Sequence, residues 1–177
     1  MPQIEVVLGD ITRQQVDCVV TAANESLLGG GGVDGAIHRA AGPSLAEAGG
    51  ALGPCEPGDA IATPAFGLNP PVKHVIHTVG PLWEGGTFGE AGLLASCYRR
   101  SLALADELGV RTIAFPAIAT GVYGFPADQA ARIAVDTLRS TPTAVKLIRL
   151  VAYDESAQDL LWTALNGVIH GGGRMAG

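Results

Sequence analysis

Short apolar runs with strong β-propensity alternate with helical patterns along this chain, and this alternation restricts the fold more than any other feature. The β-rich runs are Ile4–Leu8, Val16–Val20 (which continues into Thr21 and Ala22), Lys73–Val79, Arg111–Phe115 and Lys146–Ala152. The helical patterns are Val33–Ala41, Phe88–Leu108, Pro126–Leu138 and Ser156–Ile169. Nearly continuous apolar strands lie in sheets that are covered on both faces. We therefore expect an α/β fold with a mainly parallel sheet and helices on both sides.

The length and charge of the chain narrow the kinds of partner that it can have. A length of 177 residues suits one domain, which we place at residues 1–170, followed by a Gly-rich flexible tail at residues 171–177. The net charge of −6 argues against a broad grip on nucleic acid, because such binding needs a basic surface. An anionic ligand is still compatible, since backbone N–H groups and helix N-termini bind phosphate without Lys or Arg.

The cysteines and the apolar runs indicate the compartment. Cys18, Cys55 and Cys97 are odd in number and widely spaced, so we expect reduced thiols rather than a disulfide framework or a zinc site. The N-terminus lacks the basic and apolar regions of a signal peptide, and no apolar run approaches the roughly 20 residues that cross a bilayer. The sequence predicts a cytoplasmic protein with no membrane contact, no metal and no cofactor.

A run of four glycines marks the first candidate binding loop. The run Gly29–Gly32 follows Leu27 and Leu28 and opens the helical pattern that begins at Val33. Consecutive glycines are entropically costly, but they let a ligand approach the backbone and leave N–H groups free to point at phosphate. The positive end of the helix dipole adds to this attraction. A flexible surface linker is the alternative, and the tight flanking by apolar residues and a helix argues against it.

A second glycine-containing loop follows the strand that ends at Phe115. It reads Pro-Ala-Ile-Ala-Thr-Gly-Val-Tyr-Gly-Phe-Pro over residues 116–126 and leads into the next helical pattern. Ligands of open α/β sheets lie in the crevice beyond the carboxyl ends of the strands. Two such loops at one edge would form a clamp around a diphosphate. An ordinary strand-to-helix turn, in which Tyr123 and Phe125 only pack, would have the same sequence pattern and is the alternative.

Two other nucleotide motifs fit the glycines poorly. Gly30, Gly32 and Gly35 satisfy G-x-G-x-x-G, but six residues separate this run from the preceding strand, and no acidic residue ends a second strand about 20 residues later. A P-loop would need Gly-Lys-Ser/Thr after the glycines, which is absent from the sequence. A nucleotide-binding oxidoreductase is therefore the weakest of the functional hypotheses.

Several segments together resemble the macro domain family, and specifically the MacroD-type ADP-ribosylhydrolases. The matching segments are Gly9–Thr12, Ala22–Asn24, Leu27–Gly42, Val75–Pro81 and Thr120–Pro126, in family order and over most of the chain. The resemblance implies a three-layer α/β/α sandwich on a mixed, mainly parallel sheet. It also implies that the ligand is ADP-ribose, that the partners are mono-ADP-ribosylated proteins, and that the chain is a monomer.

The resemblance assigns a role to individual residues. Asp10 would accept a hydrogen bond from the adenine amino group with the Ile11 backbone beside it, and Tyr153 would lie near the adenine ring. Asn24 and Asp34 would face the distal ribose. The groups that would wrap the diphosphate and distal ribose are those of Gly31, Gly32, Val33, Asp34, Thr120, Gly121, Val122 and Tyr123. Asp34, Asn24 and His38 are the candidate catalytic residues.

Some of these residues have an alternative structural role. Asp34 can be a plain acid at a helix start, stabilised by the dipole. His38 lies one helical turn later on the same face, where it can orient the carboxylate or pack in the core. Asp10 can cap the turn that begins at Thr12. His77, within an apolar strand, is expected to be structural.

The chain departs from the family pattern at three positions. Thr21 stands where the family often has Asn, which puts the local loop geometry in question. Ala119 stands where a Ser is usual, so a hydroxyl contact to phosphate is lost while the backbone donor stays. Glu25 replaces a smaller residue, and its charge would disfavour some acidic substrates.

Two functions follow from the resemblance. The first is hydrolysis of the ester that links ADP-ribose to a protein Asp or Glu, with O-acetyl-ADP-ribose as a related small substrate. Asp34 would act as general base or orient the water and ribose hydroxyls, or the ligand phosphate would position the water. The second is a non-catalytic ADP-ribose reader, which needs the same clamp but no acid or base. A carboxylate beside the ribose favours the enzyme.

Overall fold

The computed structural model describes residues 1–167 and contains one mixed six-stranded sheet with the order β1-β6-β5-β2-β4-β3. The strands are β1 (Gln3–Leu8), β2 (Cys18–Ala22), β3 (Ala60–Pro64), β4 (His74–Thr78), β5 (Thr112–Phe115) and β6 (Leu147–Ala152). Neighbouring strands are parallel except for the edge strand β3, which pairs antiparallel with β4. This is the mixed, mainly parallel sheet expected from the sequence.

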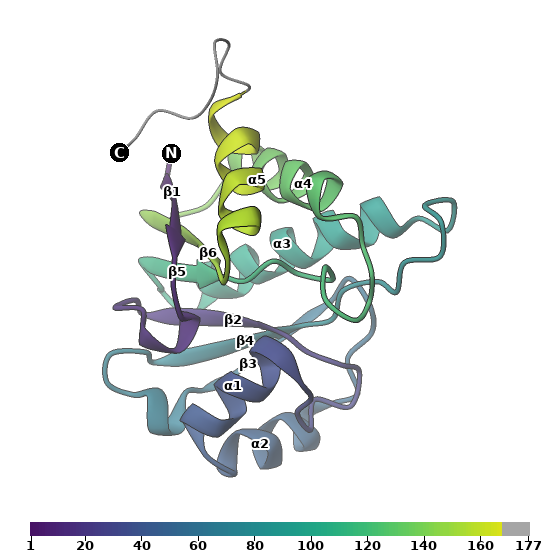
Figure 1. Ribbon diagram of the computed structural model, residues 1–177. Coiled ribbons are helices and arrows are strands. Elements are labelled where there is room, and N and C mark those ends of the chain that lie inside the picture. The colour runs from purple at the N-terminus through teal and green to yellow at the C-terminus, as the bar shows by residue number, and fades with distance from the viewer. Residues whose placement is uncertain (168–177) are drawn as a thin grey trace.

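Helices cover both faces of the sheet (Figure 1). The helices are α1 (Gly32–Ala41), α2 (Ser44–Leu52), α3 (Glu90–Glu107), α4 (Ala127–Ser140) and α5 (Glu155–Asn166), with short 3-10 turns at Ile11–Arg13 and Phe66–Leu68. α1 and α2 lie on one side of the sheet, and α3, α4 and α5 pack against one another on the other side. The predicted three-layer α/β/α sandwich is confirmed. None of the helices within residues 1–167 is long and apolar enough to cross a membrane.

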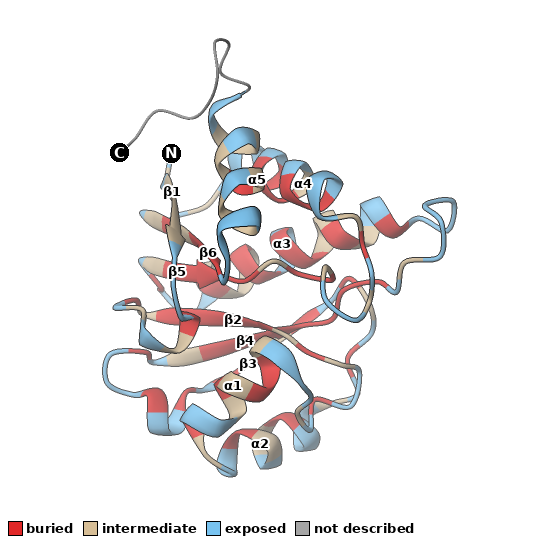
Figure 2. Ribbon diagram, viewed as in Figure 1, coloured by how far each residue is buried: buried red, intermediate tan, exposed pale blue. Residues whose placement is uncertain are grey.

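The core is divided by the sheet into two apolar layers, because successive strand residues point to opposite faces. Val20 and Ile76 belong to the layer under α3–α5, whereas Val19 and Val75 belong to the layer under α1. All four are fully buried (Figure 2). Burial on both faces explains why these strands read as continuous apolar runs rather than as alternating ones.

Two elements were missed by the pattern, and two helices were predicted too long, because Phe88–Leu108 extends past both ends of α3 and Ser156–Ile169 extends past the end of α5. β3 is short and ends in Pro64, and its β-branched residues Ile61 and Thr63 are separated by an alanine. α2 contains Gly49 and Gly50, which are poor helix formers; a Cβ on Gly49 would lie 2.6 Å from the Leu27 carbonyl oxygen. α5 ends at Asn166, before the Ile169 expected, because Gly167 adopts φ +80°. The predicted tail at residues 171–177 lies outside the described residues.

Candidate functional site

Four loops that carry predicted site residues leave the sheet at the same edge. They follow the carboxyl ends of β1, β6, β5 and β2, and these strands are consecutive neighbours in the sheet. The loops therefore lie in a row, with Asp10 after β1, Tyr153 after β6, the second glycine loop after β5 and the first glycine loop after β2. A row of loops at the carboxyl edge suits an extended ligand such as a nucleotide diphosphate.

The first glycine loop presents the start of α1 to solvent. The helix begins at Gly32, which has φ +60°, a conformation that L side chains rarely adopt. Its N-cap residue is Gly31, which has no side chain to satisfy the free N–H groups of the first turn. Gly31 and Gly32 are both exposed. The result is an uncapped helix N-terminus with free backbone donors, the arrangement that attracts phosphate.

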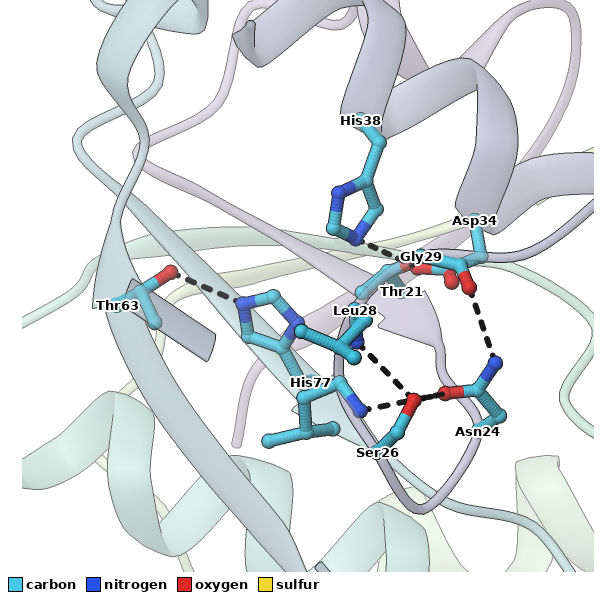
Figure 3. Close-up of polar contacts among 10 residues, drawn as sticks. Thr21, Asn24, Ser26, Leu28, Gly29, Asp34, His38, Thr63 and His77 are labelled. Carbon is cyan, nitrogen blue, oxygen red and sulfur yellow. Dashed lines mark hydrogen bonds and ion pairs between the residues drawn. The ribbon is translucent and has the colours of Figure 1, made fainter. Parts of the chain in front are cut away.

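Behind these glycines, Asp34 and Asn24 bring an acceptor and a donor together (Figure 3). The Asn24 amide is oriented by its contacts: Nδ2 donates to the Gly29 carbonyl (3.0 Å), and Oδ1 accepts from the Leu27 N–H (3.2 Å). A Cβ built on Gly30 would lie 3.5 Å from both Asn24 Nδ2 and Asp34 Oδ2. Both atoms therefore border the same point of the loop, on the side where Gly30 has no side chain.

Asp34 is buried and only half satisfied. Its Oδ1 accepts a hydrogen bond from the Thr21 hydroxyl at 2.8 Å, and His38 Nε2 lies 3.5 Å from the same oxygen. Within residues 1–167, Oδ2 accepts no hydrogen bond although it is buried. Burial raises the pKa of Asp34, and the Thr21 hydroxyl and His38 oppose that rise without cancelling it. A carboxylate with a raised pKa and a free oxygen is suited to accept a proton.

Behind the half-buried His38 lies a fully buried histidine, His77 of β4. The two rings meet edge to face with centroids 6.2 Å apart. The Thr63 hydroxyl contacts both the Pro64 carbonyl and His77 Nε2, each at 3.0 Å. Because that hydroxyl has one proton to donate, the arrangement assigns its proton to Pro64 and the Nε2 proton to His77. Burial and the nearby His38 lower the pKa of His77 to about 4, so the ring is neutral at pH 7.

The second glycine loop is held in place by its own backbone and by the segment before α3. Phe125 N–H donates to the Ala119 carbonyl (3.0 Å), and Gly124 N–H donates to Gly121 (3.0 Å). The Trp83 N–H donates to the Tyr123 carbonyl (2.8 Å), and the Trp83 ring lies on Phe125 with centroids 4.8 Å apart. The loop thus combines the packing role of Phe125 with an exposed tip at Gly121 and Val122.

The end of the row that the sequence predicts to hold adenine carries an exposed tyrosine. Tyr153 is 75% exposed and lines a cavity of about 110 Å³ together with Thr120, Asp154 and side chains of α4 and α5. Asp10 caps the 3-10 turn, since its Oδ1 accepts from both the Thr12 N–H (2.9 Å) and the Thr12 hydroxyl (2.7 Å). These bonds lower the pKa of Asp10. The capping role considered for Asp10 is thus present, and Oδ2 faces Arg13 at 3.7 Å.

The three departures from the family pattern have different structural consequences. Thr21 is fully buried and bonds Asp34, a contact that the sequence pattern did not indicate. Ala119 adopts φ +67°, a left-handed conformation that is uncommon for a residue with a side chain. Glu25 is exposed, and its carbonyl accepts from the Cys55 N–H (2.9 Å).

The family model of the macro domain matches residues 20–134. A macro domain-containing protein of Streptomyces coelicolor is 58% identical over 165 residues, which cover 90% of this chain and 96% of that protein. A protein of an Enterobacter species that is named O-acetyl-ADP-ribose deacetylase is 54% identical over 166 residues, covering 90% of this chain and 91% of that protein. This chain belongs to the macro domain family.

The fold comparison agrees with the sequence comparison. The structure of the Oceanobacillus iheyensis macrodomain with ADP has a TM-score of 0.87 to this chain at 40% identity, covering 93% of this chain and 90% of that one. A mutant of the same macrodomain with ADPR has a TM-score of 0.86 at 39% identity, covering 93% and 92%. The resemblance drawn from the glycine loops is thereby confirmed at the level of the family. Within residues 1–167, no group of three or more His, Cys, Asp or Glu side chains is placed to hold a metal ion.

Proposed function

We propose that this protein is a MacroD-type hydrolase that binds ADP-ribose and cleaves the ester between its distal ribose and a carboxylic acid, either acetate or a protein Asp or Glu. The observation that carries the proposal is the buried, unpartnered Oδ2 of Asp34, which lies with Asn24 Nδ2 next to the position that a Cβ of Gly30 would take. A non-catalytic reader has no need of a buried acid with a free oxygen, because burying one is costly.

The ligand would follow the row of four loops. Adenine would lie at the open end between Asp10 and Tyr153. The diphosphate would accept hydrogen bonds from the N–H groups at the start of α1 and from the loop Thr120–Tyr123. The distal ribose would then reach Asn24 and Asp34, where one hydroxyl or water can accept from Asn24 Nδ2 and donate to Asp34 Oδ2.

In the reaction, water adds to the ester carbonyl as Asp34 accepts its proton. The acyl–oxygen bond then breaks, and the ribose oxygen leaves with a proton as a hydroxyl, which gives ADP-ribose and a free carboxylic acid. Asp34 must be deprotonated to act as base. Because its pKa is raised, activity should fall on acidification at a higher pH than for an ordinary aspartate.

The three cysteines within residues 1–167 are free and buried, which supports a reducing, cytoplasmic location. The net charge of −6 supports a protein or small-molecule substrate rather than a long nucleic acid. A monomeric state is part of the proposal.

The deciding experiment is an incubation with a protein that carries mono-ADP-ribose on Glu, followed by quantification of free ADP-ribose. O-acetyl-ADP-ribose serves as the small substrate in parallel. Release above the spontaneous rate establishes the hydrolase. Micromolar binding of ADP-ribose without release would leave the reader as the correct function. No heat of binding at millimolar ADP-ribose would contradict both functions.

A further inference from the structure

Thr21 is the side chain that holds Asp34 from the sheet side. It lies fully buried near the carboxyl end of β2, next to His77 in the register of β2 and β4. Its hydroxyl donates to Asp34 Oδ1 at 2.8 Å (Figure 3). This bond joins β2 to the first turn of α1.

The bond distinguishes the two oxygens of the carboxylate. Oδ1 accepts a hydrogen bond from the Thr21 hydroxyl and lies 3.5 Å from His38 Nε2. Oδ2 has no hydrogen-bond partner within residues 1–167 and lies 3.5 Å from the position that a Cβ of Gly30 would take. A free carboxylate can exchange its oxygens by rotating about the Cβ–Cγ bond. A hydrogen bond from a β-branched, fully buried residue opposes that rotation, because such a side chain has few rotamers.

We infer that Thr21 is a positioning residue, which keeps Asp34 Oδ2 aimed at the substrate by engaging Oδ1. The inference rests on the proposed hydrolase function and specifies how the base of that reaction is oriented. It also assigns a function to the position where this chain departs from the family's frequent Asn.

If Thr21 had only a structural role, its bond to Asp34 would do no more than give a buried hydroxyl a hydrogen-bond partner. The chain offers a matched control for this role in Thr78 of the neighbouring strand β4. Thr78 is also fully buried, and its hydroxyl also donates one bond of 2.8 Å, but to the Asp59 carbonyl rather than to Asp34. The substitution Thr78→Val therefore measures the cost of losing such a bond away from the carboxylate.

The titratable groups around Asp34 are few. His38 faces it from α1, and His77 of β4 stands behind His38. Since the Thr21 hydroxyl stabilises the charged carboxylate, its loss should raise the pKa of Asp34 further. The acid limb of the pH–rate profile should then move to higher pH in Thr21→Val.

The experiment compares wild type, Thr21→Val, Thr21→Ser and Thr78→Val in kcat, KM, pH–rate profile and ADP-ribose Kd. We expect Thr21→Val to lower kcat on the order of tenfold with a much smaller change in Kd. Thr21→Ser, which retains the hydroxyl, should recover most of the activity. Thr78→Val should lose stability but keep kcat and the profile.

Equal kcat in Thr21→Val and Thr78→Val, or no recovery by Thr21→Ser, would overturn the positioning role while leaving the hydrolase intact. Absence of ADP-ribose release by wild type would instead remove the hydrolase and the positioning role with it. The two failures are distinguished by the wild-type measurement alone.

Discussion

At the scale of single residues, access to the candidate site depends on one absent side chain. Gly30 has no Cβ, and it lies beside Asn24 Nδ2 and the buried Asp34 Oδ2. A methyl group at Gly30 would make ordinary contacts of 3.5 Å with both atoms, and its backbone is outside the left-handed region. The fold should therefore accept a methyl group that the ligand cannot.

We predict that Gly30→Ala raises the Kd for ADP-ribose by roughly tenfold or more, which corresponds to about 1.4 kcal/mol. The free energy of unfolding should stay the same or rise by up to about 1 kcal/mol, because alanine restricts the unfolded chain. Calorimetry and denaturant titration measure the two quantities. Gly92→Ala in α3, where a Cβ meets open space, is the control and should leave the Kd unchanged. An unchanged Kd in Gly30→Ala would place the ligand elsewhere.

Asp34 is the residue on which the proposed chemistry depends. We predict that Asp34→Asn, which keeps an acceptor for Thr21, lowers ester hydrolysis by roughly 10² or more. ADP-ribose Kd should change much less, since most of the proposed contacts come from backbone donors. Activity and affinity should be measured on one folded preparation. Full activity in an active wild-type background would show that another group, such as a phosphate-held water, supplies the base.

At the scale of elements, the segment before α3 supports the second glycine loop. Glu90, at the start of α3, accepts hydrogen bonds from the N–H groups of Glu84 (3.0 Å), Gly86 (2.9 Å) and Phe88 (2.6 Å). Burial raises the pKa of Glu90, but these backbone donors outweigh burial and bring it to about 2. The segment they fold carries Trp83, which contacts the loop at Tyr123 and Phe125.

We predict that Glu90→Ala loosens this segment and thereby weakens ligand binding at a distance. Amide hydrogen exchange in residues 82–89 and 120–125 should accelerate, and the ADP-ribose Kd should rise by roughly a few-fold. The binding of AMP, which lacks the distal ribose, should change less. Glu84→Ala removes an exposed carboxylate from the same segment and is the control. Faster exchange with an unchanged Kd would show that the segment does not support the loop.

The helices, strands and loops also show which features of the fold and of the candidate site could be predicted from the sequence. The central strands were predictable, because burial on both faces leaves a continuous apolar signal in residues such as Val19, Val20 and Ile76. The glycine loops were predictable for a similar reason, since a glycine run between a strand and a helix is costly without a use. The Thr21–Asp34 bond joins residues 13 positions apart, and the Glu90 contacts use backbone donors, so neither leaves a compositional signal.

At the scale of the whole molecule, His77 couples stability to pH. Its pKa of about 4 in the folded chain lies below the ordinary value of 6.5. The unfolded chain therefore binds the proton more readily, so the contribution to stability is full above pH 6.5 and is lost as pH falls toward 4. The difference of about 2.5 in pKa corresponds to about 3 kcal/mol.

We predict that the free energy of unfolding falls less steeply between pH 6.5 and pH 4 in His77→Asn than in wild type. Denaturant titrations across that range measure both slopes. At pH 8, where His77 is neutral in the folded and unfolded chain, the same variant gives the packing cost of the substitution alone. Parallel slopes for the two proteins would contradict the assignment.

The strand order has a consequence for how the protein is made. β6, at residues 147–152, lies between β1 and β5, so β1 has no neighbour in the sheet until residues 147–152 have been synthesised. The glycine loop after β2 can assemble with β4 and β5 well before that moment. Asp10 and Tyr153, however, meet only when β6 is inserted. A nascent chain should therefore gain the two glycine loops before the end proposed to hold adenine, and should bind no ADP-ribose until β6 has entered the sheet.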